Sequence, residues 1–226
     1  DIEALFSSLS LEQKIGQLII AGFETDSADD PHFQKLVHQY HVGNVILFTR
    51  NLGERMATAR LTQGIRDTIE HDCGIPPFVV VDQEGGMVTR IFHAGNTVPG
   101  PMAVGATYDP HNAYRIGRIL GQEMRALGMN FNYAPAVEEA IFRTPSNISV
   151  RTYSDNPFMT AAFCREFVRG LQEQRVIATL KHFPGYTGVM EDAHLAIPTV
   201  RRTRNELEKV ELNAFQMVID GGADAV

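Results

Sequence analysis

The sequence predicts an α/β fold with a parallel sheet, and a (β/α)8 barrel of the TIM type is the architecture that fits best. Several short, nearly continuous apolar runs are typical of parallel strands that are covered on both faces. Helical patterns alternate with these runs, as in β/α repeats. Polar residues gather at the carboxyl ends of the expected strands, where parallel α/β folds place their functional groups.

The expected strands and helices follow one another along the chain. The strands cover residues 16–23, 42–48, 78–84, 129–138, 176–183 and 223–226. The clearest helical patterns have apolar residues at spacings of three and four, and they cover residues 52–72, 111–128, 156–174 and 203–222. A closed barrel of this type needs eight strands, and an open one leaves two strand edges unpaired. We therefore expect the chain to supply about six strands of the barrel.

The composition excludes several classes of function. The chain carries 27 acidic and 20 basic residues, for a formal charge of −7, and lacks a run of Lys and Arg, so we expect no nucleic-acid partner. The apolar runs are far shorter than the roughly 20 residues of a membrane span, so we expect no span. Cys73 and Cys164 lie far apart and in no zinc-type spacing, so we expect no disulfide framework, metal or cofactor. The compartment, cytoplasmic or exported, and the oligomeric state stay open.

The segment KHFPGYTGVMEDAH, from Lys181 to His194, holds a dense group of reactive side chains. Asp192 and His194 are two residues apart, a spacing that lets a carboxylate orient an imidazole and raise its basicity for general acid/base catalysis. A surface loop that contains both residues by chance explains this spacing equally well. Lys181 and His182 extend a buried strand, where a lysine is costly unless it reaches a polar pocket at the end of the strand.

Five stretches of the chain together resemble one family, the β-N-acetylglucosaminidases of glycoside hydrolase family three. The segment above resembles the family motif K-H-F-P-G-H-G-x-x-x-x-D-S-H. VDQEGGMVTR (81–90) resembles D-Q-E-G-G-x-V-x-R, NYAPAVE (132–138) resembles N-x-A-P-V-x-D, and NISVRTYSDNP (147–157) resembles N-P-x-I-x-x-R-S-F-x-x-D-P. GNVILFTRN (43–51) resembles the second-strand segment. The matches run in a consistent order over nearly the whole chain.

The resemblance implies a retaining glycosidase that hydrolyses terminal non-reducing N-acetyl-β-D-glucosamine residues by double displacement. It also implies a His-Asp dyad in place of the usual carboxylic acid/base, and Asp192 and His194 match that dyad. The implied partner is an N-acetylglucosamine-containing saccharide. The positions that match residues binding its hydroxyl and acetamido groups are Asp82, Arg90, Arg151, Lys181 and His182.

A structural alternative exists for the binding positions. In it, Asp82 pairs only with Arg90 and Arg151 only with Asp155, as salt bridges at the barrel rim. Glu84 is a candidate for a supporting role behind the site.

The chain also departs from the family pattern. Tyr186 and Thr187 stand where the family has His-Gly, Ala193 replaces a small hydroxyl residue, and Glu138 replaces an aspartate. The family nucleophile is an aspartate in an S-D-D-L type motif, which residues 1–226 lack. We therefore expect residues 1–226 to be the family's N-terminal barrel domain, truncated before its last strands. On this view the nucleophile lies downstream and the 226-residue chain alone is inactive.

Two other functions compete with this one. Another family-three activity, such as a β-glucosidase or β-xylosidase, fits less well because those enzymes lack the D-x-H loop. A catalytically inactive sugar-binding homologue would explain the loop substitutions and the missing nucleophile, but it gives the Asp192/His194 pair no obvious role.

Overall fold

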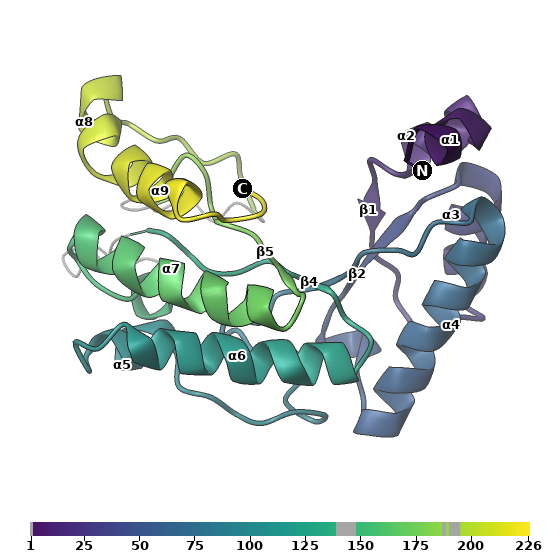
Figure 1. Ribbon diagram of the computed structural model, residues 1–226, viewed down its shortest axis with the longest axis horizontal. Coiled ribbons are helices and arrows are strands. Elements are labelled where there is room, and N and C mark those ends of the chain that lie inside the picture. Colours follow the sequence, from purple (N-terminus) through teal and green to yellow (C-terminus); the bar gives the residue numbers. More distant parts are fainter. Residues whose placement is uncertain (1, 139–147, 187–188, 190–194) are drawn as a thin grey trace. The chain divides into compact units, whose positions relative to one another are not determined.

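The computed structural model describes residues 2–138, 148–186, 189 and 195–226 (Figure 1). The chain forms two compact units. The first unit consists of Asp1–Val81, Arg90–Asn96 and Glu123–Phe131, and the second consists of Asp82–Thr89, Thr97–Gln122 and Asn132–Val226.

The strands form a parallel arrangement in which hydrogen-bonded neighbours follow the chain order β1-β2-β3-β4-β5. Ile20 of β1 pairs with Asn44 of β2, and Val45 of β2 pairs with Val79 of β3, both in parallel. The chain passes from the first unit to the second within β4. The strands are β1 Ile20–Ala21, β2 Asn44–Leu47, β3 Val79–Val81, β4 Phe131–Asn132 and β5 Ile177–Ala178.

Each of the first five predicted strands therefore contains an observed strand, whereas the sixth predicted segment shows only an isolated bridge. Ala225 forms a parallel bridge with Thr179, and the Leu180 N–H donates to the Ala225 carbonyl at 2.9 Å. The observed strands are shorter than predicted. At their ends, asparagine side chains take the place of backbone partners: the Asn44 side chain accepts from the Phe78 N–H at 3.0 Å.

The prediction of a strand over 16–23 was wrong at its start. Gly16 is the last residue of helix α2, and an added Cβ there would lie 1.7 Å from the His41 carbonyl oxygen. Ser10 and Gln13 form a capping box that begins this helix, with the Ser10 hydroxyl accepting from the Gln13 N–H at 3.1 Å. The apolar run over 16–23 therefore contains the end of α2 and a turn before it reaches β1.

The helices of the first unit include the predicted α4, Arg55–Cys73, which ends at Gly74 in the left-handed conformation (φ 72°). Three further helices were not predicted. Helices α1 and α2 are too short to show a clear periodic pattern. Helix α3 begins with two helix-start signals, since the Asp30 side chain caps it and Pro31 occupies its first turn. These elements are α1 Ile2–Ser8, α2 Leu11–Gly16 and α3 Pro31–Tyr40, followed by the 3-10 turn η1 Thr49–Asn51.

The helices of the second unit confirm the remaining predicted patterns, with one correction. The predicted helix over 203–222 is two helices, because Val210 adopts φ −121° and ψ −84° between them. Asn156 caps α7, and Pro157 is its first residue. The elements are α5 Pro101–Gly105, α6 His111–Ala126 (whose last turn belongs to the first unit), η2 Ser149–Arg151, α7 Pro157–Glu173, α8 Arg204–Lys209 and α9 Glu211–Asp220.

Each unit has its own apolar core. In the first unit, the rings of Phe23 and Phe33 lie 5.0 Å apart, and all three residues of β3 are buried. In the second, Tyr153 stacks on Phe163 of α7 at 5.3 Å. None of the helices in the described ranges combines the length and the apolar character that a bilayer span requires.

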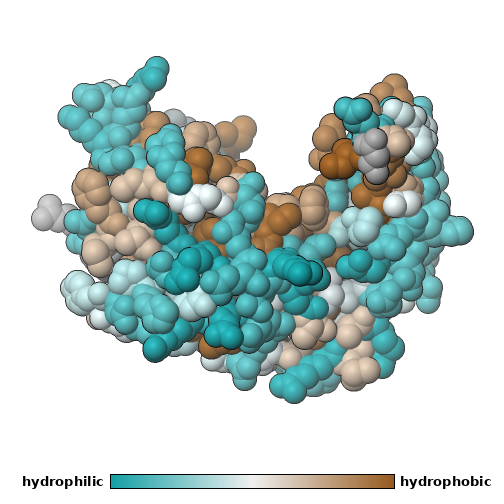
Figure 2. Space-filling model, in the orientation of Figure 1, coloured by the Kyte–Doolittle hydropathy of each residue, from teal (hydrophilic) through white to brown (hydrophobic). Residues whose placement is uncertain are grey.

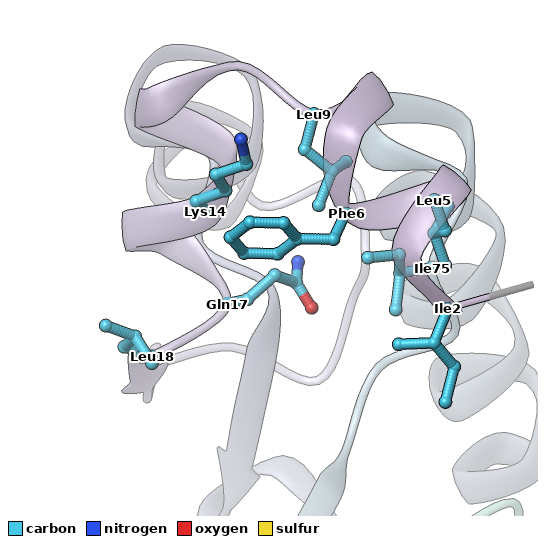
Figure 3. A pocket seen from close by; sticks show the side chains of 8 residues that line it. All are labelled: Ile2, Leu5, Phe6, Leu9, Lys14, Gln17, Leu18 and Ile75. Carbon is cyan, nitrogen blue, oxygen red and sulfur yellow. The ribbon is translucent and has the colours of Figure 1, made fainter.

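The N-terminal helices of the first unit enclose an apolar hollow of about 300 Å³ (Figure 3). The Phe6 ring lies at its centre, and the Lys14 ammonium sits 4.3 Å from the centroid of that ring. Hydrophobic surface is visible over α1 and α2 in Figure 2. The hollow is lined by Ile2, Leu5, Phe6, Leu9, Lys14, Gln17, Leu18 and Ile75.

Candidate active site

The candidate site lies in the second unit, where three segments that follow strands meet a 3-10 turn. Asp82 and Glu84 follow β3, Glu138 follows β4, and Lys181 with His182 follow β5. Parallel pairing continues past the named strands, since Ala136 bridges to Lys181 and the Val137 N–H donates to the Lys181 carbonyl at 2.8 Å. The sheet register thereby places the residues after Val137 and after Lys181 side by side.

Glu84 is the centre of an ion-pair cluster. Its side chain is 1% exposed. Arg151, the last residue of η2, donates from Nε to Glu84 Oε2 at 2.9 Å and from Nη2 to Oε1 at 2.7 Å, a bidentate contact. The Lys181 ammonium lies 2.6 Å from Glu84 Oε1 and 2.8 Å from Asp82 Oδ1. A single buried carboxylate therefore holds two cations, and one of them also pairs with Asp82.

A tight turn after Glu84 holds this carboxylate in place. The Glu84 N–H donates to the Val88 carbonyl at 2.9 Å, and Gly85 forms an antiparallel bridge with Val88. Gly86 in this turn has φ 59°, and an added Cβ there would lie 2.6 Å from the Gly100 Cα. The two glycines of the DQEGG stretch are thus required by backbone conformation and close backbone approach.

The electrostatics of the cluster are mutually consistent. Burial raises the pKa of Glu84, but the Arg151 hydrogen bonds and the charge of Lys181 lower it by more than burial raises it. The pKa of Glu84 is therefore below its usual value. Burial lowers the pKa of Arg151, and its contacts with Glu84 outweigh that and raise it. Two carboxylates (Asp82, Glu84) and two cations (Arg151, Lys181) give a formal charge of zero.

His182 is held by a different carboxylate. Glu138 Oε1 accepts from the His182 backbone N–H at 2.6 Å and lies 2.8 Å from His182 Nδ1. The Glu138 side chain is fully buried, whereas the His182 side chain is 40% exposed. The Tyr186 ring lies 6.1 Å from the His182 ring.

Helix α9 supports the chain just beyond His182. The Phe183 ring packs edge-on against Phe215 of α9 at 5.4 Å. Gly185 approaches Glu211 so closely that an added Cβ would lie 2.5 Å from the Glu211 Cγ. Glu211 is itself buried and ion-paired with Arg202. The first part of the KHFPG segment therefore rests on a helix with its own buried ion pair.

The predicted site residues divide into three groups. Asp82, Arg151 and Lys181 come together around Glu84, with His182 next to Lys181. Arg90 belongs to the first unit, whereas the other four belong to the second. Asp192 and His194 lie outside the described residues.

The alternative in which Arg151 pairs only with Asp155 was wrong. Arg151 binds Glu84, and Asp155 is exposed. Sequence reasoning gave Glu84 only a supporting role and noted Glu138 only as a substitution. Both follow strands as buried acidic residues, which is a signal that could have identified them. Among the described residues, no group of three His, Cys, Asp or Glu side chains is arranged to hold a metal ion.

Comparison with known proteins identifies the family. The family model described as "Glycosyl hydrolase family 3 N terminal domain" matches residues 10–226. A curated β-hexosaminidase of Stenotrophomonas maltophilia is 36% identical over 82% of this chain and 55% of its own length. The chain spans from about a third to about half of the length of the curated relatives it matches. These matches confirm the TIM-barrel-type α/β class.

Solved structures agree with this result. A family 3 β-N-acetylglucosaminidase from Paenibacillus sp. has a TM-score of 0.92 and 42% identity, over 97% of this chain and 41% of its own. The protein NagZ from Neisseria gonorrhoeae, solved in complex with N-trifluoroacetyl-D-glucosamine, has a TM-score of 0.83 and 25% identity over 92% of this chain and 62% of its own. This chain is therefore similar to the N-terminal domain of such enzymes.

Proposed function

This chain belongs to the N-terminal domain family of the glycosyl hydrolases of family 3, and on that premise we propose that the protein containing it removes terminal non-reducing N-acetyl-β-D-glucosamine residues from a saccharide. The names of the relatives support the substrate, since they are β-hexosaminidases and a β-N-acetylglucosaminidase. The single observation of this chain that carries the proposal is the cluster of Asp82, Arg151 and Lys181 around Glu84. Three of the family-like motifs meet in it.

The cluster is suited to bind a polyol. The Lys181 and Asp82 side chains are 12% and 20% exposed, so both have surface that a ligand can reach. Ammonium and guanidinium groups donate charge-assisted hydrogen bonds to hydroxyl and acetamido oxygens, and the Asp82 carboxylate accepts from hydroxyls. We propose that Asp82, Arg90, Arg151, Lys181 and His182 bind the sugar.

We propose His194 as the general acid/base and Asp192 as the group that orients its ring. Protonation of the glycosidic oxygen by an imidazole, followed by deprotonation of water, is one half of a retaining double displacement. The carboxylate fixes the tautomer of the imidazole and stabilises the imidazolium. The other half needs a carboxylate nucleophile, and we assign none within residues 1–226.

A leaving-group series on the protein that contains residues 1–226 tests this proposal. Aryl N-acetyl-β-D-glucosaminides with good and poor leaving groups are hydrolysed by wild type and by His194→Ala. Because a nitrophenolate needs little protonation, we expect a small loss with it and a loss of about 10²–10⁴ with poor leaving groups. Asp192→Ala should show the same trend more weakly. His111→Ala, on the exposed start of α6, is the matched control.

The outcomes separate the competing functions. Equal losses across the series would remove His194 as the acid. Binding of N-acetylglucosamine without turnover would indicate an inactive sugar-binding homologue. Faster hydrolysis of β-glucosides or β-xylosides than of N-acetylglucosaminides would indicate another family activity. Retention itself is read by NMR, as the first-formed anomer of the released sugar.

A further inference from the structure

We propose that Glu138 holds His182 in the tautomer that carries its proton on Nδ1, so that Nε2 offers a lone pair that selects a donating hydroxyl group of the sugar. The inference rests on the proposed function, because it takes His182 as a sugar-binding residue. It assigns to Glu138 the role of a positioning residue and to His182 a direction of hydrogen bonding.

The first support is that one oxygen of Glu138 contacts two nitrogens of the same residue. Oε1 lies 2.6 Å from the His182 backbone nitrogen and 2.8 Å from Nδ1. The backbone nitrogen can only donate, so Oε1 acts as an acceptor. An acceptor at hydrogen-bond distance from Nδ1 favours the ring form in which Nδ1 carries the hydrogen.

The second support is the surroundings of Glu138. Its side chain is fully buried, and its charge is, after Glu84, one of the causes that raise the pKa of Arg151, so the guanidinium lies near this carboxyl group. Because Oε1 accepts from the His182 backbone N–H, the lone pairs of this oxygen face His182, and the same oxygen meets Nδ1.

The third support is that the backbone fixes this geometry. Ala136 and Lys181 are parallel partners, and the Val137 N–H donates to the Lys181 carbonyl. Glu138 and His182 therefore follow paired positions on neighbouring segments. The contact from Glu138 to the His182 backbone N–H fixes the position from which the imidazole extends, and the His182 side chain is 40% exposed.

The chemical consequence concerns which sugar groups are tolerated. With Nδ1 committed to Glu138, a ligand that meets the second ring nitrogen meets a lone pair. A hydroxyl group donates to it. Fluorine, which has no hydrogen to donate, leaves that lone pair without a partner and loses on the order of 10-fold or more in kcat/KM.

The direct test is nitrogen-15 NMR of the histidine rings in the protein that contains residues 1–226. The His182 signals are assigned by comparison with His182→Gln. We expect protonated Nδ1 and unprotonated Nε2 at neutral pH in the wild type. In Glu138→Leu, which is similar in size and has no acceptor, this preference should be lost. Glu138→Gln keeps an acceptor oxygen and should restore it, which separates tautomer control from simple packing.

The functional test uses N-acetylglucosaminides with a single fluorine in place of the 3-, 4- or 6-hydroxyl group. In the wild type, one position should show a loss beyond the intrinsic effect of fluorine. That extra loss should largely disappear in His182→Gln and shrink in Glu138→Leu, while the other two positions act as internal controls.

The two tests fail separately. A wild-type ring protonated on Nε2 and not on Nδ1 would overturn the proposal, and so would an extra fluorine effect that is unchanged in His182→Gln. If Glu138→Leu does not fold, the wild-type spectrum still decides. If the protein cleaves no N-acetylglucosaminide, the proposed function fails, but the spectrum still reports whether Glu138 sets the tautomer.

Discussion

Replacement of Glu84 by glutamine should destabilise the fold by about 3–5 kcal/mol, the usual cost of removing one partner from a buried ion pair. Glu84 is almost fully buried and accepts from both Arg151 and Lys181. Glutamine keeps the shape and one acceptor oxygen but not the charge. The substitution therefore isolates the electrostatic contribution of the carboxylate from its packing.

The magnitude follows from the charges that remain. The wild-type cluster has two negative and two positive groups, so its formal charge is zero; in Glu84→Gln one negative and two positive groups leave +1. Lys181 keeps Asp82 as a partner, whereas Arg151 loses the carboxylate that accepts both of its described bonds. The Arg151 side chain is only 17% exposed, so water compensates for little of this loss.

The effect should depend on pH in a defined direction. Although burial raises the pKa of Glu84, its cationic partners bring it below its usual value of 4.5. A carboxyl group with a depressed folded-state pKa stabilises the fold above its unfolded-state pKa, and this contribution is lost as the pH falls through the folded-state value. The difference in unfolding free energy between wild type and Glu84→Gln should thus be full at pH 7 and shrink only once the pH falls below the usual value of 4.5.

The assay is equilibrium unfolding in urea at pH 7, repeated at lower pH, on the protein that contains residues 1–226. Glu208→Gln is the matched control, because Glu208 makes an exposed pair with Arg204 four residues away in α8 and should have a much smaller effect. A loss in Glu84→Gln no larger than in this control would refute the reasoning. A loss that persists unchanged at low pH would assign the effect to packing.

Two further predictions concern local structure. Gly128→Ala should destabilise the fold more than Gly74→Ala. Gly128 has φ 82° and an added Cβ would lie 2.4 Å from Thr62 Oγ1, whereas Gly74 has φ 72° and no described atom within 4 Å. Both variants carry the left-handed backbone cost of about 1–2 kcal/mol, so the difference between their unfolding free energies measures the clash, and equal losses would contradict it. Asn156→Ala should cost about 1 kcal/mol, because the Asn156 side chain accepts from the Phe158 N–H at 2.9 Å at the start of α7; an unchanged unfolding midpoint would show that the cap contributes nothing.

Much of the fold could be predicted because its signals are local. Apolar runs such as Val79–Val81 and amphipathic patterns such as that of α4 depend only on spacing along the chain. The elements that were missed depend on other information. Short helices such as α1 and α2 show too few turns for a periodic pattern, and the break at Val210 interrupts a pattern whose apolar spacing continues across it.

Three members of the cluster were predictable from the sequence, but their pairing was not. The motif positions and the strand ends located Asp82, Arg151 and Lys181, because the carboxyl ends of parallel strands meet at one edge of a sheet. The pairing of Arg151 with Glu84 joins residues 67 positions apart, and nothing in the sequence near Arg151 predicts it. The structural alternative named Asp155 as the partner of Arg151, whereas the structure pairs Arg151 with Glu84.

The way the cluster uses its hydrogen-bond donors bears on whether it is structural or functional. An ammonium group has three donors and a guanidinium group has five. Within the described residues, Lys181 directs two contacts to Asp82 and Glu84, and Arg151 directs two to Glu84. A buried carboxylate thus fixes the position of both cations, and the contacts among the described residues use only part of their donor capacity. Groups held in place before the ligand arrives bind it without a further ordering cost. On the function proposed above, loss of Glu84 should therefore weaken the binding of N-acetylglucosamine as well as the fold.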